Sequence, residues 1–204
     1  MSLTRRMALA AALLPWAGIA AAADAAAVSP ITALNAGLIA GMRAGKATPF
    51  NQRFATLAPV VEAAFDLPGI LQASVGPRWS ALPAPQQGQL LEVFRRFTVA
   101  SYVANFDTFS GERLEVLTES RNVGADQVVA TQIVPPGGTP TRLDYVMRRT
   151  PAGWRAVDVL LNASISRVAV QRSDFRSLLI SGDAAPLIAS LQRKIAELSG
   201  GALS

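Results

Sequence analysis

The sequence contains no histidine and no cysteine, and these two absences exclude several classes of function. The chain cannot form a Ser–His or Cys–His nucleophile pair, a zinc site built on imidazole or thiolate, an iron–sulfur cluster or a disulfide. It also has no cysteine that could carry a lipid anchor at a signal cleavage site. We therefore expect a core that is stable without cross-links, no metal, no cofactor and no enzymatic activity.

Charged residues are also scarce, and they are scattered along the chain. They make up 16% of the 204 residues, whereas 50% are hydrophobic, which is typical of a folded protein of one domain. The formal net charge is +5. Its densest pairs, Arg95-Arg96 and Arg148-Arg149, stand alone, so no basic stripe is available to follow a nucleic-acid backbone. A transient membrane surface is an expected partner, and nucleic acid is not.

Residues 1–23 have the three parts of a secretory signal peptide. Arg5 and Arg6 precede an apolar stretch from Met7 to Ala23, and the alanines that follow offer several small-residue cleavage frames. The stretch is interrupted by Pro15 and is shorter than the ~20 strongly apolar residues of a membrane span. We expect export to the periplasm, by the general secretory route (Sec) rather than the twin-arginine route, with cleavage near Ala23.

Apolar residues spaced three and four apart predict helices in the first half of the mature chain. Pro30 after Ser29 is typical of a first helical turn, and Asp66 is a suitable cap between two helices. The predicted helices run from Ser29-Pro30 to Gly45, from Phe50 to Ala64, from Leu67 to Val75 and, after Pro83 and Pro85, to Ala104. The last of these is the most aromatic part of the chain.

The period changes from helical to alternating at Gly111, which predicts strands. The predicted strands span residues 114–119, 127–134, 142–148 and 154–161, and helices return after Ile165 and after Asp183. The strand at 154–161 is apolar on both faces, which favours a central position in the sheet, with helices or a ligand covering each side. The pattern predicts an α+β fold in which N-terminal helices precede a four-stranded or slightly larger antiparallel curved sheet and helices follow it.

Two strings near the end of this pattern resemble a known family. They are Trp154-Arg-Ala-Val-Asp-Val-Leu-Leu-Asn-Ala-Ser-Ile-Ser166 and Val168-Ala-Val-Gln-Arg-Ser-Asp-Phe175. Both are similar to the signature of the periplasmic MlaC family, also called toluene-tolerance proteins. The resemblance covers most of residues 47–198, and the other matching positions are Phe65-Asp66, Gly76 to Trp79, Gln86-Gln87, Phe94, Phe97, Tyr102, Phe109, Gly111-Glu112 and Tyr145.

Within that family, three strings resemble the hopanoid-associated HpnM branch. They are Val75-Gly-Pro-Arg-Trp79, Tyr102-Val-Ala-Asn-Phe106 and Ala169-Val-Gln-Arg-Ser-Asp-Phe175. One position departs from the family pattern, because members usually have an acidic residue and a glycine where this chain has Asn162 and Ala163. If the glycine is needed for a positive φ, Ala163 adopts that conformation at a cost of about 1 kcal/mol.

The resemblance implies a fold similar to nuclear-transport-factor-like cones, with an apolar cavity between helices and sheet. It also implies a carrier that moves a phospholipid or a hopanoid between the inner and outer membranes, together with an inner-membrane transporter and an outer-membrane acceptor. The implied organisation is a signal peptide (1–23), an N-terminal segment with the first helix (24–46), a lipid-binding domain (47–199) and a tail (200–204). A non-carrying adaptor with a solid interior and a cone-fold enzyme are the alternatives.

The strand faces and the aromatic helix provide the candidate cavity walls, although such stripes also occur in filled cores. The candidate lipid-binding residues are Phe97, Tyr102, Val116, Tyr145, Met147, Val159 and Ile165. Asp158 is expected to be buried and paired with Arg172 or Tyr102, as a structural group. In the enzyme alternative Asp158 would be a general base beside Tyr145. Arg148, Arg149 and Arg155 form either a solvated face or a contact for an anionic headgroup.

Overall fold

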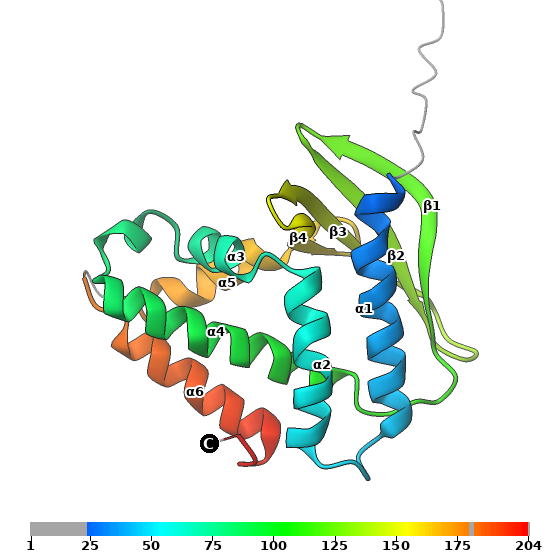
Figure 1. Cartoon of the computed structure of the whole chain (residues 1–204), viewed down its shortest axis with the longest axis horizontal. Coiled ribbons are helices and arrows are strands. Elements are labelled where there is room, and N and C mark those ends of the chain that lie inside the picture. The colour runs from blue at the N-terminus through cyan, green and yellow to red at the C-terminus, as the bar shows by residue number, and fades with distance from the viewer. Residues whose placement is uncertain (1–23, 180–181, 204) are drawn as a thin grey trace, which may run out of the picture.

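The computed structural model describes residues 24–179 and 182–203, so the predicted signal peptide lies outside the described residues (Figure 1). The helices are α1 (Ala25–Ala44), α2 (Phe50–Ala64), α3 (Leu67–Val75), the 3₁₀ helix η1 (Gly76–Ala81), α4 (Ala84–Asn105), α5 (Arg167–Arg176) and α6 (Ala185–Ser199). The strands are β1 (Arg113–Val123), β2 (Asp126–Val134), β3 (Thr141–Thr150), β4 (Gly153–Leu161) and β5 (Ile165–Ser166).

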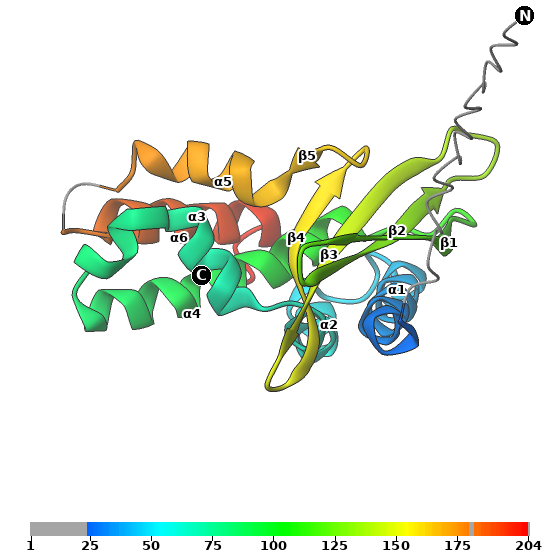
Figure 2. The ribbon, with the colours of Figure 1, turned by 90° about the horizontal axis from the view of Figure 1, so that it is seen from above.

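The strands form one antiparallel sheet in the order β1-β2-β3-β4-β5. The helices α1 and α2 lie along one face of this sheet, and α3, α4, α5 and α6 gather at the other end of the molecule (Figure 2). The predicted α+β fold, with helices before and after an antiparallel sheet, is confirmed. The fifth strand, β5, has only two residues, in a segment that was predicted to begin a helix.

The predicted central position of the fourth strand is wrong. β4 lies between β3 and the short β5, so only Leu160 and Leu161 pair with a strand on its outer side. Its apolar residues are covered by helices, as expected, since α1, α2, α3 and α5 all contact β4. A single parallel bridge between Ala156 and Phe65 also ties β4 to the junction of α2 and α3.

The first helix begins earlier than predicted. Asp24 is its N-cap, since the Asp24 side chain accepts a hydrogen bond from the backbone N–H of Ala26, and Pro30 lies inside the helix. The alanines before Ser29 have high helix propensity and extend the helix towards Asp24, a better cap than Ser29. The predicted cap at Asp66 is confirmed, because its carboxylate accepts from the N–H of Gly69 at 3.1 Å.

α1 is long and apolar enough to cross a membrane by length and composition. In this fold one side of the helix is buried, and its core residues are Ala27, Ile31, Leu34 and Leu38. They belong to the same hydrophobic cluster as residues of α2, α4, α6 and the sheet. α1 is therefore an integral helix of the folded domain.

The turn after β4 contains Ala163, the position at which the sequence departs from the family pattern, and it has the positive φ considered above. Asn162 and Ala163 have φ values of 51° and 60°, and no other non-glycine residue in the described part of the chain has a positive φ. Asparagine tolerates this left-handed region, whereas alanine is strained there by about 1 kcal/mol or more. The chain therefore has a positive φ at Ala163, where a glycine would adopt it without strain.

Candidate functional site: an apolar cavity between sheet and helices

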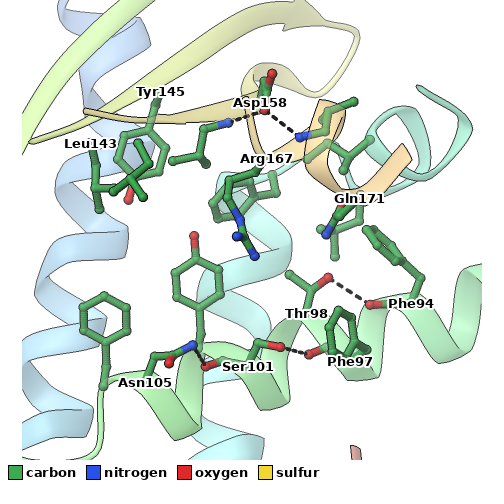
Figure 3. A pocket seen from close by; sticks show the side chains of 18 of the residues that line it. Phe94, Phe97, Thr98, Ser101, Asn105, Leu143, Tyr145, Asp158, Arg167 and Gln171 are labelled. Carbon is green, nitrogen blue, oxygen red and sulfur yellow. Dashed lines mark hydrogen bonds between the residues drawn. The ribbon is translucent and has the colours of Figure 1, made fainter. Parts of the chain in front are cut away.

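A cavity of about 580 Å³ lies where the helical end of the molecule meets the sheet (Figure 3). Its walls come from α3, α4, α5 and the ends of β2, β3 and β4. The lining residues are mostly apolar: Phe65, Leu67, Ile70, Phe94, Phe97, Thr98, Ser101, Tyr102, Asn105, Phe106, Ile133, Thr141, Leu143, Tyr145, Asp158, Val159, Leu161, Arg167, Val168 and Gln171. A cavity of this size and composition suits an apolar ligand.

Aromatic rings form the inner wall of the cavity. The ring of Phe65 lies 5.6 Å from that of Tyr102 and 6.1 Å from that of Tyr145, and Tyr102 stacks on Phe106 at 5.9 Å. These are favourable separations for aromatic pairs. Phe65 is only 5% exposed and Tyr145 only 2%, so these two rings of the inner wall are shielded from solvent.

The two tyrosine hydroxyls remain neutral at ordinary pH. Burial is the main cause that raises the pKa of Tyr102 well above its usual value; contact with Tyr145 adds to this, and the positive charge of Arg167 opposes it. Burial also raises the pKa of Tyr145 to about 12, against a hydrogen bond with Tyr102 that lowers it. The inner wall therefore presents hydroxyl groups but no charge.

Polar residues mark the opening. Asn105, Thr141 and Arg167 line the cavity and are exposed to solvent. The hydroxyls of Thr98 and Ser101 and the amide of Asn105 donate to carbonyl oxygens one turn earlier in α4, so these three side chains have internal partners. Among the residues that line the cavity, only Asp158 and Arg167 carry a charge.

Asp158 is partly buried rather than buried as expected, and its predicted partners are wrong. Its carboxylate accepts hydrogen bonds from the Ser166 hydroxyl, from the N–H of Val159 at 2.8 Å and from the N–H of Val168 at 3.1 Å. Arg172 donates to the carbonyl oxygen of Ala73 at 2.9 Å and 2.6 Å instead. The carboxylate is held at the start of α5, where the helix dipole favours a negative charge.

Four of the seven predicted lipid-binding residues meet in this cavity: Phe97, Tyr102, Tyr145 and Val159. Met147 is fully buried away from it, because it pairs with Ala156 beneath the α2–α3 junction. Val116 lines a separate shallow groove beside α1, and Ile165 is 49% exposed in β5. Strand alternation places a residue on a face of the sheet, but which helix covers that stretch decides whether it reaches the cavity.

Several lining residues were not predicted, although a signal existed for some of them. Leu143 precedes Tyr145 by two residues on the same strand face, and Phe106, the C-cap of α4, follows Tyr102 by four residues. Arg167 and Gln171 have the same spacing on α5. Their role depends on where α5 lies relative to α4, which one sequence does not reveal.

The arginines near the β3–β4 turn face away from the cavity. Arg148 binds Asp126 through two hydrogen bonds of 2.9 Å and 2.6 Å, and Arg149 lies 3.7 Å from Asp24 and over the ring of Trp154. Arg148 and Arg149 thus have partners within the fold. Among the described residues, no group of three or more acidic side chains is placed to hold a metal ion.

Comparison with known protein families matches residues 33–193 to the family described as MlaC protein. This range includes every residue that lines the cavity. The chain belongs to the MlaC family. No curated protein matches the sequence.

A solved structure has the MlaC fold of this chain. It is described as a phospholipid-binding protein from Ralstonia solanacearum in complex with a phospholipid. The two chains share 20% sequence identity and superpose with a TM-score of 0.72, over 88% of this chain and 99% of the other. At this identity the likeness establishes the shared fold, including the arrangement of helices around the sheet.

Proposed function

We propose that this MlaC family member is a periplasmic lipid carrier that moves a phospholipid or a hopanoid between the inner and outer membranes. The observation that carries the proposal is the cavity of about 580 Å³, with buried aromatic rings in its inner wall and exposed polar residues at its opening. Family membership supports lipid binding, and so does the phospholipid bound by the Ralstonia solanacearum protein of the same fold.

The chemistry of the cavity fits reversible carriage. Each methylene group removed from water contributes about 0.8 kcal/mol, so an apolar cavity binds a lipid tail strongly without covalent chemistry. Exchange with an inner-membrane transporter and an outer-membrane acceptor would let the lipid leave the cavity. Assignment to the HpnM branch, and thus to hopanoid transport, stays a prediction.

The two alternatives find less support in the geometry. A non-carrying adaptor would need no cavity, and the described residues enclose one. In the enzyme alternative Asp158 acts as a base, yet its carboxylate is occupied by Ser166 and by two backbone N–H groups. We therefore propose that the protein is not an enzyme.

Native mass spectrometry of the protein exported from cells with their membranes tests the carrier function. We expect one lipid per chain and a polypeptide mass that corresponds to cleavage near Ala23, which leaves Asp24 to cap α1. An empty protein that also takes up no lipid from vesicles would contradict the proposal.

A variant that fills the cavity tests the location of the lipid. Val159 lines the cavity from β4, so Val159→Trp should occupy the space of the ligand and lower lipid extraction from vesicles at least tenfold. Val123→Trp is the matched control, because Val123 is 55% exposed at the end of β1. Equal extraction by both variants would place the lipid elsewhere.

A further inference from the structure

The opening of the cavity carries one cation whose role the fold does not explain. Arg167 is the first residue of α5, it is exposed, and it lines the cavity. Among the described residues, its guanidinium forms no hydrogen bond and no ion pair. Several other arginines do have partners: Arg142 and Arg148 bind carboxylates, and Arg53 and Arg172 bind backbone carbonyls.

The Arg167 side chain is directed into the cavity. Figure 3 shows it between α5 and α4, with Thr98 and Ser101 on the facing helix. Its positive charge also acts on the hydroxyl of Tyr102, where it opposes the larger effect of burial on that pKa. An arginine that faces an apolar space presents hydrogen-bond donors that a hydrocarbon tail cannot satisfy.

A second donor lies one helical turn further along. Gln171 also lines the cavity, and its side-chain oxygen accepts a hydrogen bond from the Ser74 hydroxyl at 3.1 Å. This contact fixes the amide and leaves its N–H groups available. Arg167 and Gln171 thus form a pair of donors, four residues apart, on one face of α5.

The other polar groups at the start of α5 are already used. The N–H groups of Val168 and Ala169 donate to Asp158 and Ser166, and the Asp158 carboxylate also accepts a hydrogen bond from the Ser166 hydroxyl. An anion at the opening would therefore be bound by the side chains of Arg167 and Gln171 rather than by the helix amides.

We propose that Arg167, assisted by the amide of Gln171, binds the phosphodiester of a phospholipid whose tails occupy the cavity. This rests on the proposed carrier function and deepens it. The planar guanidinium matches two phosphate oxygens, and a neutral hopanoid offers no anion to that group. The site therefore selects a phospholipid over a neutral polycyclic lipid.

Binding of tail-labelled lipids delivered from cyclodextrin tests this inference. The probes are phosphatidylglycerol, diacylglycerol with the same tails and a neutral hopanoid, and tail fluorescence reports entry into the cavity. We expect the wild-type protein to bind phosphatidylglycerol at least tenfold more tightly than either neutral lipid. Arg167→Gln should weaken phosphatidylglycerol binding roughly tenfold to a hundredfold and leave diacylglycerol binding unchanged.

The controls separate the two proposals. Arg176→Gln removes an exposed cation from the same helix outside the cavity and should change no affinity, and Arg167→Lys keeps the charge and should retain a preference for phosphatidylglycerol. Circular dichroism verifies that each variant is folded. Equal wild-type affinity for phosphatidylglycerol and diacylglycerol, or no effect of Arg167→Gln, would overturn the headgroup site alone. If the wild-type protein binds no lipid, the carrier function fails as well.

Inorganic phosphate distinguishes a lipid headgroup from a free anion. Millimolar phosphate should leave phosphatidylglycerol bound, because the tails supply most of the affinity. Displacement of the lipid by phosphate at that concentration would mean that Arg167 binds a soluble anion rather than a lipid headgroup, and would overturn the proposal.

Discussion

At the scale of single residues, one buried carboxylate links β3 to β1 across the intervening β2. Asp144 in β3 is fully buried and lies 2.8 Å from the Nε atom of Arg142 and 3.5 Å from a guanidinium nitrogen of Arg121 in β1. Both arginines remain partly exposed, so their charges keep contact with water. The carboxylate is the member of this network that burial makes costly to leave unpaired.

We expect Asp144→Ala to lower the free energy of unfolding by about 2 kcal/mol, because it leaves a small cavity and two arginines without their shared anion. Glu119→Ala is the matched control: Glu119 also pairs with Arg142 but is 63% exposed, and its loss should cost under about 0.5 kcal/mol. Urea unfolding measures both. Equal losses would show that Asp144 has no special role.

In the strained turn after β4, a substitution should raise the free energy of unfolding instead of lowering it. Ala163→Gly should raise the free energy of unfolding by about 0.5 kcal/mol, because relief of the positive φ exceeds the entropy that glycine adds to the unfolded chain. Ala152→Gly, in the turn between β3 and β4 at a residue without positive φ, should lower it. A lower free energy of unfolding for Ala163→Gly would contradict the inference that Ala163 is strained.

At the scale of elements, α5 forms a wall of the cavity and is held in place at two points. Asp158 and Ser166 cap its first turn, and Arg172 and Gln171 bind the end of α3. The helix has a short and mostly exposed sequence, with Phe175 as its only buried residue. These polar contacts therefore decide its position more than hydrophobic burial does.

We expect Asp158→Ala to lower the free energy of unfolding by about 2 kcal/mol and to speed amide hydrogen exchange at Val168 and Ala169, since two hydrogen bonds at the helix start and one to Val159 in β4 are lost. Asp174→Ala, on the exposed side of the same helix, should change stability by under about 0.5 kcal/mol. Unchanged exchange at residues 168 and 169 would argue against the anchoring role.

At the scale of the whole molecule, the buried tyrosines couple folding to alkaline pH. Tyr102 and Tyr145 are the only tyrosines in the sequence, so tyrosinate absorbance near 295 nm reports on them alone. Burial raises both pKa values in the folded state, whereas an unfolded chain ionises near pH ~10. The contribution of these two tyrosines to the free energy of unfolding is therefore fully present below pH ~10 and is lost as the pH rises further.

We expect the free energy of unfolding to fall by on the order of 3 kcal/mol between pH ~10 and the Tyr145 pKa of about 12. The reason is that in this range only the unfolded chain releases the Tyr145 proton. Tyr102 acts in the same direction. Urea unfolding at several pH values measures the loss, and Tyr145→Phe should reduce it. A tyrosinate midpoint near pH 10 in the folded protein would contradict the burial.

Much of the fold could be predicted from the sequence, because periodicity and caps are local. Asp66, Gly45 and Gly76 end or begin helices where the pattern indicates, and each predicted strand forms. The N-terminus of α1 was missed, since Ser29-Pro30 imitates a helix start inside a helix that Asp24 caps. The cover of β4 by helices was expected, but the helices bury it beside the short β5 as well, so its apolar residues did not fix its place in the sheet.

The sequence by itself determined that the chain is an α+β domain without thiol, imidazole or disulfide chemistry, since composition and spacing are properties of the chain alone. Only the tertiary structure decided which apolar residues enclose a space. Phe97 and Met147 follow equally regular patterns, yet Phe97 borders the cavity and Met147 fills the core. That difference depends on the gap between α4, α5 and the sheet, and so on contacts between segments far apart in the sequence.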